Sequence, residues 1–264
     1  MKRWVLLLTL FCSPFLFCDS NQPLFFQSQT ALSSNAQDLF SFSWTQTIDF
    51  ECSFKTSSLD SLDLTFTRIR GEGSYQDHEF QLDTDEEDET NYELASLKQI
   101  LNIPFHICLT PDLSIKKPVP DFAQVLELTP GLGDSLSEDL LDLLLSSILA
   151  PSRYDTKKNI LSMPLYYPFQ SNLTVSPNLA LQKFDSEIFF DQDLDVTGPY
   201  SIGADLFSLQ LSGEVAGEIK WDNNSQFSKY FRLSHSLNEK AVDPLFAKPL
   251  QFDYSFCLQQ ITHD

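Results

Sequence analysis

Apolar and polar residues alternate over a long stretch near the start of this sequence. From Phe40 to Phe54, every even-numbered residue except Gln46 is apolar, and the odd-numbered residues between them are polar. A period of two is typical of a β-strand with one buried face. A strand of this length would span roughly 50 Å. We therefore expect it to twist and bend along its length.

The same alternation returns toward the C-terminus. Apolar residues or glycines occupy the odd positions of 207–221, and after the polar residues 222–226 the odd positions of 227–237 are again mostly apolar. The even positions of 250–258 repeat the pattern. These runs predict a long hairpin and a final strand. Gly213 lies at an inward position, where a glycine often marks a bend or the close approach of another backbone.

Two stretches have helical spacing instead. Apolar residues recur every three or four positions in 92–103, which ends before Pro104, and in 136–149, which Pro151 follows closely. This spacing predicts two amphipathic helices. Together the patterns predict an α+β fold. We expect a large, curved antiparallel sheet, half-barrel or barrel-like, with two helices packed on it, and residues 21–264 as a single sheet-rich domain.

The N-terminal residues indicate export. Lys2 and Arg3 precede an apolar stretch, 4–18, that is too short for a membrane-spanning helix. We interpret residues 1–20 as a signal peptide, so the mature chain is predicted to be periplasmic or secreted and not membrane-spanning. The alternative is a lipid anchor through Cys18, although Phe17 directly before it does not fit a lipid-attachment site.

The net charge limits the possible partners, and the number of cysteines limits the possible disulfides. The formal net charge of −20 argues against nucleic acid as a partner. Beyond the signal peptide only Cys52, Cys108 and Cys257 remain, so at most one internal disulfide can form. Cys108 and Cys257 both lie at positions opposite to the apolar set of their strands, which favours a bond between them. Cys52 belongs to an apolar set and is predicted to stay a buried thiol.

No pattern in the sequence indicates a metal or another cofactor. An EF-hand loop that began at Asp83 would need glycine at Asp88 and glutamate at Leu94. The four histidines are scattered, without the spacing that a metal site or a catalytic relay requires.

One short motif resembles a catalytic signature. Gly133-Asp134-Ser135-Leu136 is similar to the serine motif of the GDSL hydrolase family, which also needs an Asp-x-x-His near the C-terminus; here Gln260 stands three residues before His263. Without a carboxylate to orient the imidazole, the relay is incomplete. Ser135 and Glu138 instead fit a capping box at the start of the second helix. A GDSL-like hydrolase is thus a remote alternative to a non-enzymatic protein.

A few polar residues interrupt the inward apolar positions. Gln46, Lys229 and His235 share the parity of their apolar neighbours, and Trp44 adjoins Gln46 on the same face. Polar groups in an apolar concavity orient bound ligands in many proteins. We therefore take Trp44, Gln46, Lys229 and His235 as candidate ligand-binding residues. The alternative is that the polar residues lie at the rim of the sheet, where the inner face meets water.

The order of these features resembles that of a group of uncharacterised exported bacterial proteins. The resemblance rests on the signal peptide, the long alternating strands, the leucine-rich helix and the segments 105–112 and 211–222. Two positions depart from the pattern of the group, because Leu113 and Asn223 stand where glycines are expected. The resemblance implies export and a single sheet-rich domain.

These observations favour an exported, non-enzymatic protein that acts as a carrier or chaperone for an apolar ligand, a lipid or a lipoprotein. The alternative is an envelope or secreted interaction protein whose core is filled and holds no ligand. The expected partners are accordingly an apolar small molecule or an envelope protein.

Overall fold

The computed structural model describes residues 23–36, 40–54, 59–75, 78–86, 92–117, 119, 138–168, 171–181, 185–202, 205–223, 225–240 and 249–262. The predicted signal peptide, Ser135 with its motif, and His263 lie outside these residues.

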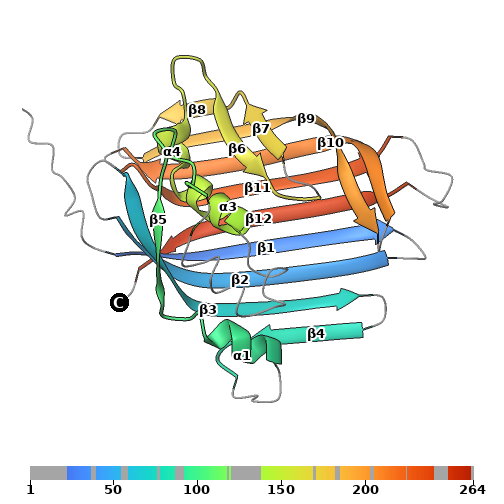
Figure 1. Ribbon diagram of the computed structural model, residues 1–264. Coiled ribbons are helices and arrows are strands. Elements are labelled where there is room, and N and C mark those ends of the chain that lie inside the picture. The colour runs from blue at the N-terminus through green and yellow to red at the C-terminus, as the bar shows by residue number, and fades with distance from the viewer. Residues whose placement is uncertain are drawn as a thin grey trace, which may run out of the picture.

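Within the described residues, ten antiparallel strands form one large sheet (Figure 1). Their order is β4-β3-β2-β1-β12-β11-β10-β9-β8, and β5 pairs with the opposite end of β3 from β4. The strands are β1 (Leu24–Ala36), β2 (Phe40–Phe54), β3 (Ser61–Tyr75), β4 (His78–Asp83), β5 (Pro104–Cys108), β8 (Asn178–Leu181), β9 (Asp185–Ile202), β10 (Asp205–Asp222), β11 (Ser228–Glu239) and β12 (Gln251–Ile261). The first and last of the described strands, β1 and β12, thus pair in the middle of the sheet.

The long alternation in β2 gives one buried and one polar face, as predicted. Gln46, Ile48 and Phe50 are buried, whereas the residues between them reach the outer face. On the outer face Asp49 accepts a hydrogen bond from Gln27 at 2.7 Å and pairs with Arg70 at 3.3 Å. The apolar face therefore faces the protein interior, and the polar face carries the cross-strand contacts typical of a solvated sheet.

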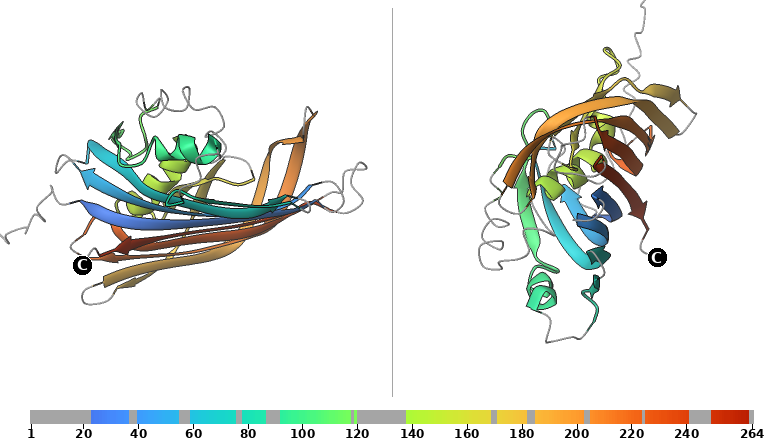
Figure 2. Two further views of the ribbon diagram at one scale, coloured as in Figure 1. Left: turned by 90° about the horizontal axis from the view of Figure 1, so that it is seen from below. Right: turned by 90° about the vertical axis from the view of Figure 1, so that its right-hand side faces the viewer.

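The helices lie on one face of the sheet, which is called the inner face here (Figure 2). The helix α3 (Glu138–Ile148) continues into the short α4 (Ala150–Arg153). Ser228 at the start of β11 donates a hydrogen bond of 2.7 Å to the carbonyl oxygen of Ser147, and this bond anchors α3 to the sheet. Within the described residues, none of the helices is both long and apolar enough to cross a membrane.

The first predicted helix is shorter than expected. It forms as α1 (Tyr92–Lys98), and a turn follows it up to β5. Asn102 has a left-handed φ of 60°, and its amide donates to the carbonyl oxygen of Phe66 at 2.8 Å. The chain leaves the helix early because it must turn onto the edge of β3, and Pro104 also restricts the residue before it.

A second, two-stranded sheet lies on the inner side in front of the main one (Figure 1). It consists of β6 (Leu161–Leu165) and β7 (Ser171–Val175). Between them, Tyr166 and Tyr167 pack against side chains of the main sheet. This hairpin therefore brings aromatic side chains onto the inner face.

The sheet bends gently toward α3 (Figure 2). At one end, the rings of Phe54 and Phe227 stack with centroids 4.5 Å apart, although β1 and β12 separate β2 from β11. The sheet is not closed or strongly curled among the described residues, and the barrel-like form that the sequence predicts is not confirmed.

The cysteines correct one prediction. Cys52, Cys108 and Cys257 are all free, and Cys52 is buried as predicted. Cys108 lies on β5 and Cys257 on β12, with three strands between them. Four strand spacings amount to about 19 Å, far beyond the roughly 7 Å between Cα atoms that a disulfide can bridge. The predicted bond between Cys108 and Cys257 is therefore wrong.

Candidate functional site

Cross-strand registers arrange the inner face in rows that run across the sheet. One row, called the polar row here, contains two buried polar rings side by side, and the row beside it contributes Ser34. The polar row consists of Gly73, Trp44, Leu32, Tyr254, His235 and Val215. Trp44 and His235, both predicted from the sequence, thus lie in one row, and Gln46 lies in the next row.

Lys229 does not belong to this face. The register between β10 and β11 shifts at Lys220 and Trp221, so Ser228 turns inward and Lys229 turns outward. The Lys229 ammonium pairs with Asp185 at 3.1 Å and with Asp222 at 3.6 Å. These carboxylates raise the pKa of Lys229, the hydrogen bond to Asp185 being the largest cause. The inward position predicted for Lys229 is therefore wrong, because the irregularity reverses the parity of the strand.

His235 is the most unusual residue of the polar row. Its side chain is buried, and neither ring nitrogen meets hydrogen-bond geometry with a described residue, although the Tyr167 backbone lies close enough to favour the protonated ring. Burial lowers the pKa of His235 to about 4, against smaller opposing effects from the Tyr167 backbone and from Asp253. His235 is therefore neutral at neutral pH, and its ring carries one donor and one acceptor.

Tyr254 adjoins His235 on the neighbouring strand. The two rings stack with centroids 5.1 Å apart and planes at 20°. The Tyr254 hydroxyl is buried and lacks a hydrogen-bond partner in the part of the chain that the structure describes. Burial, with a smaller contribution from Tyr166, raises the pKa of Tyr254 well above its ordinary value. The hydroxyl is thus protonated and free to donate.

Ser34 on β1 completes the set. Its Cα lies opposite Phe252 in the register, diagonally across from Tyr254, at a typical separation of about 7–8 Å. Its hydroxyl is buried and without a partner among the described residues. Ser34, His235 and Tyr254 are together called the polar cluster.

Tyr167 covers the polar cluster from the side of the β6–β7 hairpin. Its ring stacks on Tyr254 at 6.3 Å and meets Phe252 and Phe42 edge-on at 5.8 Å and 6.2 Å. Phe42 and Phe252 are the cross-strand neighbours of Ser34. The Tyr167 ring, which comes from outside the main sheet, therefore lies over Tyr254 and over the two neighbours of Ser34.

The other predicted residues flank the cluster. Gln46 is buried opposite Thr30, one row away. Trp44 is half-buried and stacks on Phe80 with centroids 5.2 Å apart. A Cβ atom on Gly71 would lie only 2.2 Å from the Trp44 ring, so glycine in β3 makes room for the indole. Trp44 and Phe80 thus form an aromatic pair between β2 and β4.

The cluster has hydrogen-bonding capacity but no catalytic arrangement. A serine nucleophile needs a base within hydrogen-bond reach and a third group to orient that base. Neither His235 nitrogen has such a partner among the described residues. Uncharged donors and acceptors surrounded by apolar side chains are instead suited to orienting a bound molecule.

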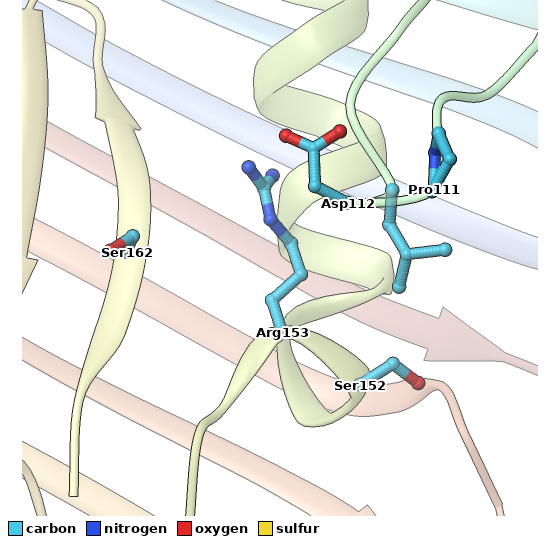
Figure 3. Close-up of a pocket in the computed structure, with 6 residues that line it drawn as sticks. Pro111, Asp112, Ser152, Arg153 and Ser162 are labelled. Carbon is cyan, nitrogen blue, oxygen red and sulfur yellow. The ribbon is translucent and has the colours of Figure 1, made fainter. Parts of the chain in front are cut away.

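A surface pocket of about 320 Å³ lies elsewhere, between α4 and the turn after β5 (Figure 3). Arg153 lines it and faces Asp112. The Arg153 guanidinium donates to the hydroxyls of Ser146 and Ser114, the latter at 3.4 Å. Burial lowers the pKa of Arg153, and Asp142 and Asp112 oppose this effect. The guanidinium is thus held by side chains of its own chain, which makes this pocket the weaker candidate.

The sequence predicts only part of the cluster. Its alternation places Tyr254 at an inward position of the last strand, but nothing in the sequence distinguishes the Tyr254 hydroxyl from the apolar side chains around it. Ser34 lies on β1, which was not predicted because Ser28 and Thr30 also occupy its inward positions. Ser28, Thr30 and Ser34 are hydroxyl residues at inward positions of one strand, and they are the signal in the sequence for a polar inner face. The same residues weaken the alternation of apolar and polar positions that identifies a strand.

Comparison with known proteins supports only the fold. No family model matches the chain, and no curated protein matches it. Among solved structures, one of lipovitellin, described for its lipid–protein interactions, is similar with a TM-score of 0.54 at 9% sequence identity. The match covers 91% of this chain and 25% of the lipovitellin chain. This chain thus spans about a quarter of the length of that protein and shares the fold of that part.

Proposed function

We propose that this protein is an exported, non-enzymatic carrier of an apolar ligand such as a lipid, which binds along the inner face of the sheet. The observation that carries the proposal is the polar cluster: Ser34, His235 and Tyr254 hold buried polar atoms that find no partner in the described chain. Such atoms cost free energy in the folded state. Hydrogen bonds from these atoms to a bound ligand would account for their presence.

The surroundings of the cluster fit an apolar ligand. Phe252, Leu237 and Val215 beside it are buried, and the half-buried rings of Phe42 and Trp44 continue the apolar surface toward β4. Ligand sites commonly combine a largely apolar lining with a few polar groups that fix orientation. The fold shared with part of lipovitellin is compatible with this proposal.

The second candidate is an envelope or secreted interaction protein whose inner face is filled by its own chain. The contacts of Tyr167 with Phe42, Phe252 and Tyr254 favour it, because they already cover the cluster. In a carrier the same ring would have to move aside. The two candidates therefore differ in whether the space over the cluster accepts a molecule.

Native mass spectrometry of the full chain, purified without denaturant, distinguishes them. A carrier retains a co-purified apolar molecule, which organic extraction removes. Two variants with the same substitution on neighbouring residues locate the site: Ser34→Phe places a ring on the inner face, whereas Ser33→Phe places it on the outer face. We expect the bound mass to disappear in Ser34→Phe and to persist in Ser33→Phe.

Circular dichroism first establishes that both variants are folded. An unliganded wild-type chain that also fails to take up added lipid would contradict the carrier proposal. Equal retention of the bound molecule by both variants would place the ligand away from the cluster.

A further inference from the structure

The chemistry of the polar cluster also limits which ligands it accepts. We propose that Ser34, His235 and Tyr254 bind the uncharged polar end of the ligand, a hydroxyl, ester or amide group, and discriminate against anionic head groups. This inference rests on the carrier function proposed above and adds the class of ligand.

The positions of the three residues define one binding spot. His235 and Tyr254 are direct cross-strand neighbours with stacked rings, and Ser34 lies diagonally beyond Tyr254. Tyr167 lies over Tyr254 and over the two neighbours of Ser34. A ligand that displaced the Tyr167 ring would lie against the Tyr254 ring and the two neighbours of Ser34. The two hydroxyls and the imidazole of the cluster supply both donors and acceptors to this part of the inner face.

Charged side chains do not line this spot in the described residues. The polar row and the two rows beside it contain no charged side chain among the described residues. Asp253 points to the outer face, where it accepts hydrogen bonds from Ser236 at 2.6 Å and from Gln251. Glu239 is at the rim, four residues from His235, and accepts from the Leu250 amide at 3.2 Å. No described lysine or arginine is placed to neutralise a buried anion.

The cluster itself is neutral near pH 7. Burial keeps His235 unprotonated by lowering its pKa, and it keeps Tyr254 protonated by raising its pKa. Tyr166 and Tyr167, the titratable groups that face the rings from the β6–β7 hairpin, are hydroxyls and bring no carboxylate or amine. A carboxylate or phosphate entering this environment would lose its hydration without gaining a cation. A hydroxyl or carbonyl would lose far less.

Competition binding with a neutral naphthylamine fluorophore tests the inference. A long-chain alcohol and the fatty acid of equal chain length are each titrated against the bound fluorophore at pH 7, below the concentration at which either forms micelles. We expect the alcohol to displace the fluorophore at roughly a hundredfold lower concentration than the carboxylate, because only the carboxylate must be desolvated as an ion.

Variants show whether the cluster makes this distinction. Tyr254→Phe removes one hydroxyl and should weaken alcohol binding about fivefold, the effect of one neutral hydrogen bond. Ser34→Ala should act similarly and serves as the second variant if Tyr254→Phe is poorly folded. The matched control is Tyr230→Phe, which removes a hydroxyl from the strand next to β12, at a position between the exposed Lys229 and the buried Phe231. We expect that control to bind the alcohol like the wild type.

The outcomes separate the two proposals. If the fluorophore binds but alcohol and carboxylate compete equally, or if neither cluster variant weakens alcohol binding, the proposed selectivity is overturned while the carrier function stands. If no fluorophore, alcohol or acid binds to the folded wild-type chain, both proposals fail.

Discussion

Two parallel rows cross the inner face, yet they are built differently. In the apolar row, the buried residues are hydrophobic except for Ser28; they are Ile69, Ile48, Ser28, Leu258, Phe231, Ile219 and Ile188. The polar row instead contains His235 and Tyr254, whose polar atoms lack partners among the described residues. The same strands supply both rows, so the difference lies in the side chains and not in the backbone.

The difference between the rows indicates that buried side chains have two roles in this sheet: one row stabilises the fold, and the other keeps polar groups on the inner face. The apolar row stabilises the fold by removing hydrophobic surface from water. The polar row buries groups at a net cost, which a sequence selected only for stability would avoid. Three substitutions, described from the largest expected effect to the smallest, test this division.

Truncation in the apolar row should destabilise the protein most. Phe231 is buried between Leu258 and Ile219 in the register, so Phe231→Ala removes a ring from a close-packed site. We expect the free energy of unfolding to fall by about 3–5 kcal/mol, measured by urea denaturation. The control is Phe189→Ala, since Phe189 is 48% exposed; its effect should stay below about 1 kcal/mol. Equal losses in both variants would contradict the assignment of the apolar row as core.

The polar row should make stability sensitive to acid. The pKa of His235 is about 4 in the folded state and 6.5 in the reference state, so the unfolded chain binds the proton more tightly and acid favours unfolding. His235 alone should lower the free energy of unfolding by up to about 3 kcal/mol between pH 6.5 and pH 4.

Comparison with His235→Phe isolates this contribution from that of the carboxylates. The variant keeps a ring to stack on Tyr254, and its stability should fall less than that of the wild type over the same pH range. Parallel pH dependences of the two proteins would show that His235 does not titrate as proposed.

Removal of a hydroxyl from the polar row should have the smallest effect, and in the opposite direction. Tyr254→Phe deletes a buried hydroxyl without a described partner, and the folded state then no longer bears the cost of its desolvation. We expect thermal or urea unfolding to show a stabilisation of about 1 kcal/mol. A loss of stability would indicate that the hydroxyl has a structural partner.

Much of the fold could be predicted from the spacing of apolar residues alone. The strand from Phe40 to Phe54, the hairpin of β10 and β11, the last strand and the leucine-rich helix follow from residue periodicity, which depends only on local sequence. The disulfide prediction failed because it depended on which strands are neighbours. Strand order is a property of the whole chain, and it separates Cys108 from Cys257.

The candidate site was only partly predictable for related reasons. His235 and Gln46 stood out as polar residues on inward positions, and both are buried. Lys229 has the same parity in the sequence, but the irregularity after Lys220 reverses its direction. Tyr167 reaches the cluster from a separate hairpin, and no periodicity within β11 or β12 indicates that contact.

The most direct test of the central claim is side-chain nitrogen NMR of His235 during titration with a long-chain alcohol. The resonance is assigned by its loss in His235→Phe, and His106 serves as the internal reference because it is exposed and bonds to Asp63 at 3.0 Å on the sheet edge. We predict that the His235 signal shifts saturably with the alcohol while the His106 signal stays fixed. An unchanged His235 signal at alcohol concentrations that displace the fluorophore would contradict binding at the polar cluster.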